Sequence, residues 1–218
     1  MRNLDNFGDN LINWWEKHGR RYPWRETDDP YKVFIAEILL HRTRAESVLP
    51  VYLELVNRYE SFQKLYTADE TSLHIFLKSL GLKWRVTKLI ESVRLIVEGY
   101  DAELPMEKYI LQQIPGIGDY IASAILTMLG KSSEPLIDTN TVRVIARLMQ
   151  WGQTDSLRRA KKVRYKYVEL RGNTDSKKFG LSLIDLAFKI CRPTGPLCEN
   201  CPVTQECKYF EAKSKLTT

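Results

Sequence analysis

Apolar residues recur along this chain at the three- and four-residue spacing of an α-helix, without the clean two-residue alternation that marks a strand. Gly130 directly follows one such stripe and is suited to end its helix, because glycine adopts a left-handed backbone conformation at little cost. The pattern predicts an all-α fold without repeats, long linkers or low-complexity segments. The stripes lie at residues 34–39, 48–55, 89–97, 121–128, 142–149 and 181–188.

The size and composition fit a protein of the cytoplasm. A chain of 218 residues and 25.4 kDa can bury one large hydrophobic core or two small ones. No apolar run approaches the roughly 18–20 residues of a transmembrane helix. The N-terminal stretch MRNLDNFGDN lacks the charged and then apolar layout of a signal peptide. We therefore expect a monomeric cytoplasmic protein with no membrane partner.

Positive charge is concentrated toward the C-terminus. From Lys131 onward the chain carries 17 Lys and Arg against 9 Asp and Glu, and before it 16 against 18. Such an excess favours a polyanionic partner, above all nucleic acid, although many basic surfaces are only solvated. The densest run is most simply a solvated helix face, with salt-sensitive, non-specific DNA affinity as the alternative. It comprises Arg158, Arg159, Lys161, Lys162, Arg164 and Lys166.

All four cysteines lie within the last 28 residues, with the spacing Cys191-x6-Cys198-x2-Cys201-x5-Cys207. Disulfides are disfavoured because nothing points to an oxidising compartment. A zinc ribbon normally has two C-x2-C pairs, whereas this loop has one. Four thiolates in one compact loop favour an iron–sulfur cluster over zinc. No flavin or nicotinamide motif accompanies them, so a structural role is favoured over electron transfer.

The stretch PGIGDY predicts a tight turn that leads into a helix. Pro115 ends one helix, and Gly116 and Gly118 allow a positive φ or a close approach of the backbone to a ligand. The next helix begins at Asp119–Tyr120, and its unpaired N–H groups can bind a phosphate. The turn is therefore either a simple helix connection or a sequence-independent DNA contact.

Two acidic residues stand at unusual places. Asp138 follows an apolar stretch and precedes a helix that begins near Thr139, where an aspartate most often acts as an N-cap. The alternative is a carboxylate held at the mouth of a cleft. Glu37 interrupts an apolar helical stretch, so it either reaches solvent or is a buried acid that faces a site.

Together these features resemble the helix–hairpin–helix DNA glycosylases of the endonuclease III superfamily. The resemblance covers nearly the whole chain, and five matching segments in the same order are far more specific than any one of them. The segments are RRYPWRETDDPYKVFIAEILLHRT (20–43), GLKWR (81–85), IPGIGDYIASAIL (114–126), IDTNTVRVIARL (137–148) and the cysteine loop (191–207).

The resemblance implies two helical domains with a DNA cleft between them. Residues 28–132 would form a six-helix barrel domain that carries the helix–hairpin–helix at about 109–129. Residues 1–27 and 133–218 would form the cluster domain, with a [4Fe–4S] cluster bound by the four cysteines. Three tryptophans are expected to pack between the N-terminal segment and the cluster domain, namely Trp14, Trp15 and Trp24.

The resemblance also assigns the chemistry. A base inside duplex DNA cannot be reached, so the nucleotide is flipped into a pocket between the domains. Breaking the N-glycosidic bond leaves a sugar with oxocarbenium character, which a carboxylate can stabilise while it positions or deprotonates water. Asp138 is the residue expected in that catalytic role. Gly116 and Gly118 are expected to bind the DNA backbone.

Tyr120 separates the subfamilies. Endonuclease III-like enzymes have a lysine at this point, whose amine attacks the sugar and adds a lyase step. Tyrosine cannot form a Schiff base, so we expect a monofunctional glycosylase. Adenine glycosylases of the MutY type usually have serine here and need an acid at Glu37. They usually also carry a C-terminal domain that reads oxidised guanine, whereas this chain ends eleven residues after Cys207.

The thymine/uracil mismatch glycosylases of the archaeal Mig type are more similar. They have tyrosine in the hairpin motif and a basic loop where this chain has His41 and Arg42, residues that in the family fill the duplex where the base has left. A guanidinium suits the acceptors of guanine, whereas His41 departs from the expected second arginine. Trp84 is either a wedge from the other side of the base pair or a core residue.

We therefore expect a prokaryotic, possibly archaeal, base excision enzyme that acts on double-stranded DNA and removes thymine or uracil opposite guanine. The first alternative is a MutY-type glycosylase that removes adenine opposite guanine or 8-oxoguanine. An alternative of another class is a non-catalytic iron–sulfur DNA-binding protein. Release of free base separates the enzymes from the last.

Overall fold

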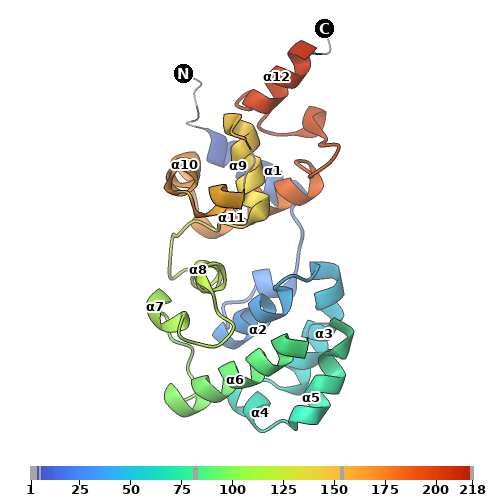
Figure 1. Ribbon diagram of the computed structural model, residues 1–218, viewed down its shortest axis with the longest axis vertical. Helices are drawn as coiled ribbons and strands as arrows, with labels where there is room; N and C mark the ends of the chain where they lie inside the picture. The colour runs from blue at the N-terminus through green and yellow to red at the C-terminus, as the bar shows by residue number, and fades with distance from the viewer. Residues whose placement is uncertain (1–3, 5, 81–82, 153–154, 217–218) are drawn as a thin grey trace. The chain divides into compact units, whose positions relative to one another are not determined.

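The computed structural model describes residue 4 and residues 6–80, 83–152 and 155–216. Over these residues it contains twelve α-helices and four short 3₁₀-helices, and no strand (Figure 1). The all-α class predicted from the apolar spacing is confirmed. No helix in the described part of the chain combines the length and the apolar character needed to cross a bilayer.

The chain divides into two compact units, the first formed by Met1–Arg20 together with Ser133–Thr218 and the second by Arg21–Ser132. The second unit is therefore continuous, and both ends of the chain belong to the first. The sequence-based expectation placed the first boundary at residues 27 and 28, seven residues later.

The first unit is built around α11, which contacts both α1 and α9 (Figure 1). One hydrophobic core joins these helices, with Phe7, Ile145, Tyr167, Phe179 and Leu183 buried at its centre. The apolar stripes of the sequence supply these side chains. The elements of this unit are α1 (Phe7–His18), α9 (Thr139–Met149), η3 (Asp155–Arg159), α10 (Lys161–Arg171), α11 (Ser176–Lys189), η4 (Cys198–Asn200) and α12 (Lys208–Leu216).

The second unit is built around α2, which contacts α3, α6 and α8. Asp29 caps α2 by accepting from the backbone N–H of Tyr31, and Pro30 occupies the first helical position, where its missing N–H costs nothing. The helix is apolar on nearly all sides, as expected of a central helix. The elements are η1 (Pro23–Arg25), α2 (Pro30–Leu40), α3 (Ala45–Arg58), α4 (Phe62–Tyr66), α5 (Glu70–Phe76), η2 (Leu77–Leu80), α6 (Lys83–Gly99), α7 (Lys108–Leu111) and α8 (Asp119–Met128).

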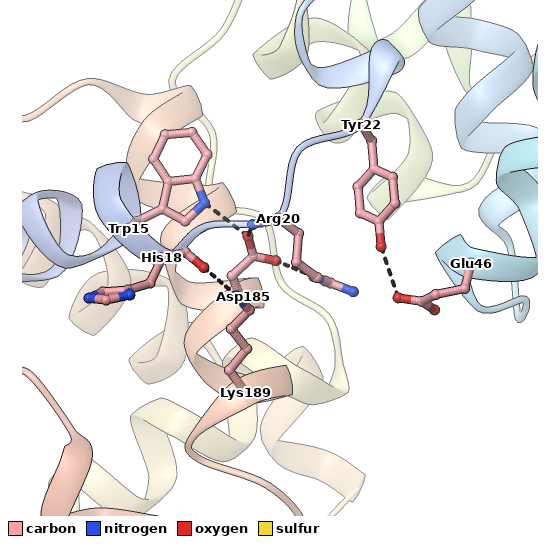
Figure 2. Close-up of polar contacts among 7 residues, drawn as sticks. All are labelled: Trp15, His18, Arg20, Tyr22, Glu46, Asp185 and Lys189. Atoms are coloured by element: carbon pink, nitrogen blue, oxygen red, sulfur yellow. Dashed lines mark hydrogen bonds and ion pairs between the residues drawn. The ribbon is translucent and has the colours of Figure 1, made fainter.

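The buried carboxylate of Asp185 binds residues near the end of the N-terminal segment of the first unit (Figure 2). Asp185 of α11 is fully buried and accepts from Trp15 Nε1 at 2.9 Å, from the Arg20 backbone N at 2.8 Å and from Arg20 Nε at 2.7 Å. Lys189 donates to the carbonyl of His18 (Figure 2). The Arg20 guanidinium also lies over the ring of Phe188. These contacts explain why residues up to Arg20 belong to this unit.

The following residues belong to the second unit. Tyr22 donates to Glu46 at 2.8 Å (Figure 2), and its ring stacks on that of Trp24, with 4.7 Å between the centroids. Trp24 also meets Tyr52 edge to face at 5.0 Å. Trp24 therefore packs within the second unit, which corrects the expectation that it packs between the N-terminal segment and the cluster domain. Trp15 packs as expected, since its indole is bound by Asp185.

Candidate functional site

Asp138 is fixed at the N-terminus of α9. Its Oδ1 accepts from the backbone N of Asn140 at 2.9 Å and of Thr141 at 2.7 Å, and the Thr141 hydroxyl accepts from the Asp138 backbone N at 2.9 Å. This reciprocal pair is a capping box. The carboxylate is partly exposed. Asp138 is therefore both the N-cap of α9 and a group that a ligand can reach.

The carboxylate of Asp138 is the first link of a hydrogen-bond chain. Its Oδ2 accepts from the Asn140 side-chain amide at 2.7 Å, and Arg143 donates to the Asn140 side-chain oxygen at 3.1 Å. Arg143 also donates to the backbone carbonyls of Ala187 at 3.0 Å and Cys191 at 2.9 Å. The orientation of the carboxylate is thus coupled to the start of the cysteine loop. Sequence reasoning missed Arg143, whose only local signal is its place one turn after Asn140.

The four cysteines line one pocket with an open volume of about 420 Å³, together with Arg147 and apolar side chains. All four thiols are free. Burial raises the pKa of Cys201 to about 12 and also raises the pKa of Cys198 and Cys207, so these thiols ionise readily only with a cation beside them. Within the described residues, no three His, Cys, Asp or Glu side chains form a group that could hold a metal ion.

Arg147 fastens the loop from the α9 side. Its Nη1 lies 3.4 Å from the Cys191 sulfur and 2.6 Å from the Arg192 carbonyl, and its Nη2 lies 2.8 Å from the Pro193 carbonyl. The guanidinium also lies over the ring of Tyr209, 5.2 Å from its centroid. A donor beside a thiolate stabilises its negative charge, so Arg147 is suited to the surroundings of a ligand cysteine.

Glu37 is buried within α2 of the second unit, only 9% exposed. Burial raises its pKa from 4.5 to about 7, against a smaller lowering by the Arg25 guanidinium. This burial excludes the first alternative left by the sequence, that Glu37 reaches solvent. A carboxyl with this pKa can hold and release a proton near neutral pH.

The two glycines of the hairpin differ in whether the fold requires them. Gly116 has φ +84°, and a Cβ there would lie 3.2 Å from the Lys88 Cβ, so the fold itself demands glycine. Gly118 has an ordinary φ of −91°, and a Cβ there would meet nothing within 4 Å. Nothing in the described chain therefore explains Gly118. Ser92 of α6 donates to the Pro115 carbonyl and holds the turn in place.

Tyr120 is the second residue of α8 and is half-buried. Asp119 precedes it and pairs with Lys108 of α7 at 2.8 Å. The pair ties the two short helices of the hairpin together. The polar aromatic thus stands at the open end of an otherwise buried apolar helix.

The turn after α2 is exposed and strained. Arg42 is exposed with φ +59°, a left-handed conformation that non-glycine residues adopt at a cost. His41 precedes it, and its ring meets that of Trp84 edge to face, 5.5 Å between centroids. Trp84 is 41% exposed, so it is not a core residue. The structure brings these two sequence-predicted residues together at the start of α6.

The predicted site residues are thus divided between the units. Asp138 and the four cysteines lie in the first, and the other predicted residues lie in the second. These are Glu37, His41, Arg42, Trp84, Gly116, Gly118 and Tyr120.

The comparisons with known proteins decide the family. A family model described as HhH-GPD superfamily base excision DNA repair protein matches residues 35–170, more than half of the chain. The chain belongs to this HhH-GPD superfamily. The family expected from the five sequence segments, a helix–hairpin–helix DNA glycosylase, is therefore confirmed.

Individual relatives of this HhH-GPD protein extend over nearly its full length. It is 33% identical to the thymine-DNA glycosylase of Aeropyrum pernix over 92% of each chain. It is 30% identical to the thymine/uracil-DNA glycosylase of Methanothermobacter thermautotrophicus, over 94% of this chain and 93% of that one. A solved thermostable thymine-DNA glycosylase superposes with a TM-score of 0.87 at 28% identity, covering 96% and 97%. The two named relatives are archaeal.

Adenine glycosylases are more distant relatives. The adenine DNA glycosylase of Buchnera aphidicola (subsp. Schizaphis graminum) is 26% identical over 95% of this chain, but the match covers only 60% of that protein. The rival subfamily is thus similar throughout this HhH-GPD chain and extends beyond the matched region.

Proposed function

We propose that this protein is a monofunctional DNA glycosylase that hydrolyses the N-glycosidic bond of thymine or uracil mispaired with guanine. The observation that carries the chemistry is the carboxylate of Asp138, fixed by three donors and yet partly exposed. The thymine/uracil specificity of the full-length relatives supports the substrate.

In the proposed mechanism, the target nucleotide leaves the duplex and its sugar comes to lie against Asp138. As the glycosidic bond breaks, positive charge develops on the sugar, and a preoriented carboxylate stabilises it without reorganising. Asp138 also orients the attacking water or takes its proton. Asn140 acts as a positioning residue, because its side-chain amide holds the carboxylate, and Arg143 in turn holds Asn140.

Tyr120 supports the absence of a lyase step. A phenol cannot form the Schiff base through which a lysine would cleave the strand. We propose that Tyr120 faces the flipped nucleotide and that the reaction stops at the abasic site. Glu37 is a candidate proton donor, with a pKa near neutrality, although a leaving pyrimidine needs protonation less than a leaving adenine.

Residues of the second unit support the proposed DNA contacts. The strained, exposed Arg42 is proposed to fill the space of the flipped base and to bind the acceptors of the orphaned guanine, next to His41. Trp84 would support the same loop. Gly118, which the fold does not require, is proposed to allow the backbone to approach a phosphate.

We also propose that the four cysteines bind a [4Fe–4S] cluster. They lie close together in the sequence and line one pocket, and four thiolates in one compact loop suit a polynuclear centre. Such a cluster would supply cationic iron that holds the thiolates ionised and the loop closed. Arg147 and Arg143, which grip the loop, are the residues of α9 that would meet it.

The proposal is tested with duplexes that carry G·T, G·U, A·G or A·8-oxoguanine, each with and without alkali after the reaction. We expect strand breaks on G·T and G·U only after alkali. Breaks on A·8-oxoguanine alone would establish the adenine glycosylase instead. Breaks without alkali would contradict the monofunctional assignment, and binding without release of any free base would indicate the non-catalytic alternative.

Asp138→Asn tests the catalytic carboxylate. Asparagine is as good an N-cap as aspartate, so folding and DNA binding should persist while single-turnover excision falls at least about 100-fold. Asp175→Asn is the matched control, because Asp175 caps α11 in the same way and has no proposed role. Retained excision in Asp138→Asn would refute the assignment.

A further inference from the structure

The whole net charge of the protein resides in nine residues. The segment 158–166 contains six Lys and Arg and no acid. The chain has 33 Lys and Arg against 27 Asp and Glu, so without these six it carries 27 of each and no net charge. This one segment therefore carries as much net positive charge as the whole chain.

The fold turns this segment outward. Val163, Tyr167 and Leu170 bury one face of α10 in the core of the first unit, so Lys161 and Lys162 must point away from it. Both are exposed, as are Arg158 and Arg159 in η3, the 3₁₀-helix that directly precedes α10. We refer to residues 158–166 as the α10 basic face.

Aromatic side chains accompany these cations. Tyr165 lies in the middle of the α10 basic face and is 71% exposed, although tyrosine is usually at least partly covered. The Lys162 ammonium lies over the ring of Trp151, 4.5 Å from its centroid, which holds this lysine in place.

Helix stability does not explain these charges. Lys161 and Lys162 occupy the first turn of α10, where the helix dipole disfavours cations, and Ala160 at the N-cap provides no side-chain hydrogen bond. Lys166 pairs with Glu169 at 2.6 Å. In the part of the chain that the structure describes, no acid pairs with Arg158, Arg159, Lys161 or Lys162. Cations that the helix dipole disfavours and that no acid neutralises are typical of functional surfaces.

The Lys162 end of the α10 basic face is separate from the carboxylate of Asp138. Asp138 caps one end of α9, and Trp151, on which Lys162 lies, follows the other end. A helix of 11 residues is about 16 Å long. The Lys162 end of the face therefore lies about one helix length from the Asp138 carboxylate.

We propose that the α10 basic face is a second, sequence-independent DNA-binding surface that contacts the phosphate backbone of the duplex away from the target nucleotide. Arg and Lys neutralise phosphates and release counterions, and an exposed tyrosine donates to phosphate oxygens. The surface keeps the enzyme on undamaged DNA and does not take part in bond cleavage. This proposal depends on the proposed function only in that the protein acts on DNA. It does not depend on which base the protein removes.

The test measures binding to undamaged duplexes of about 40 and about 10 base pairs over a range of salt concentrations. The variant Arg158→Gln/Lys161→Gln/Lys162→Gln removes three cations and should lower the salt slope on the long duplex by about two to three, since each phosphate contact contributes about 0.9. Affinity for the long duplex at low salt should fall at least about tenfold, with a smaller loss on the short one.

The matched control is Lys17→Gln/Arg58→Gln/Lys64→Gln, which removes three exposed cations elsewhere. If both variants lose the same affinity and slope, the effect is only net charge and the proposal is wrong. An unchanged slope in the α10 variant also overturns it. Single-turnover excision at saturating enzyme should be unchanged. If no mismatch is processed but the slope still falls, the substrate proposal fails and the α10 basic face stands.

Discussion

Glu37 places an ionisable carboxyl among apolar side chains of α2, with a folded-state pKa of about 7 against an ordinary value of 4.5. The unfolded chain loses this proton near pH 4.5, whereas the folded protein keeps it to about pH 7. The contribution of Glu37 to stability is therefore greatest below pH 4.5 and falls as the pH rises to about 7, by on the order of 3 kcal/mol.

Glu37→Gln should abolish this loss of stability with rising pH. We expect the variant to gain stability over the parent at pH 8 and much less at pH 5, as measured by chemical denaturation at both values. Glu54→Gln on the exposed face of α3 is the control and should change neither. If Glu37→Gln changed the free energy of unfolding equally at both pH values, burial would not raise the pKa of the Glu37 carboxyl.

Asp185 illustrates a different consequence of burial. Its carboxylate accepts from Trp15 Nε1 and from the backbone N and Nε of Arg20, so Asp185→Ala removes the buried acceptor of these three donors. Removing one partner of a buried pair costs roughly 3–5 kcal/mol. Asp175→Ala, which removes only an exposed helix cap, should cost about 1 kcal/mol. Urea denaturation monitored by tryptophan fluorescence compares the two, and similar losses would contradict the role of Asp185.

At the scale of elements, the hairpin before α8 separates folding from binding. Gly116→Ala forces an L-residue to φ +84° against Lys88 and should cost about 1–3 kcal/mol of stability. Gly118→Ala adds a methyl group to open space, so the melting temperature should hardly change. Its cost should appear in DNA affinity, roughly tenfold, because a hydrogen bond to a charged group is worth about 1.5–3 kcal/mol. A loss of stability in Gly118→Ala with unchanged affinity would reverse this assignment.

The elements were predictable where their signals are local. Asp138, three residues before Thr141, predicts the start of α9, and Gly130 ends α8 with φ +67°. The bonds from Arg143 to Cys191 and from Trp15 to Asp185 span 48 and 170 residues, and no local pattern encodes them. Packing decides such contacts, so the cysteine loop could be recognised from sequence but not the arginines that hold it.

At the scale of the whole molecule, the chain leaves one unit after Arg20 and returns to it at Ser133. Each unit has its own buried helix at the centre, α11 in the first and α2 in the second. Units with separate cores can open independently. The cysteines belong to only one of them, since Cys191, Cys201 and Cys207 pack partly buried against the core of the first unit.

Removal of the proposed cluster should therefore loosen one unit and spare the other. Without a metal centre the loop 191–207 is no longer closed by four thiolates, and the conformational entropy regained by the loop destabilises the core beneath it. We expect iron removal by chelator and oxidant to speed amide hydrogen exchange in α9, α11 and α12, with α2, α6 and α8 as protected as before. Cys201→Ser, which replaces one of the four proposed ligands, should give the same pattern without chemical treatment. Equal loss of protection in both units, or none in either, would show that the cysteine loop does not stabilise the first unit in this way.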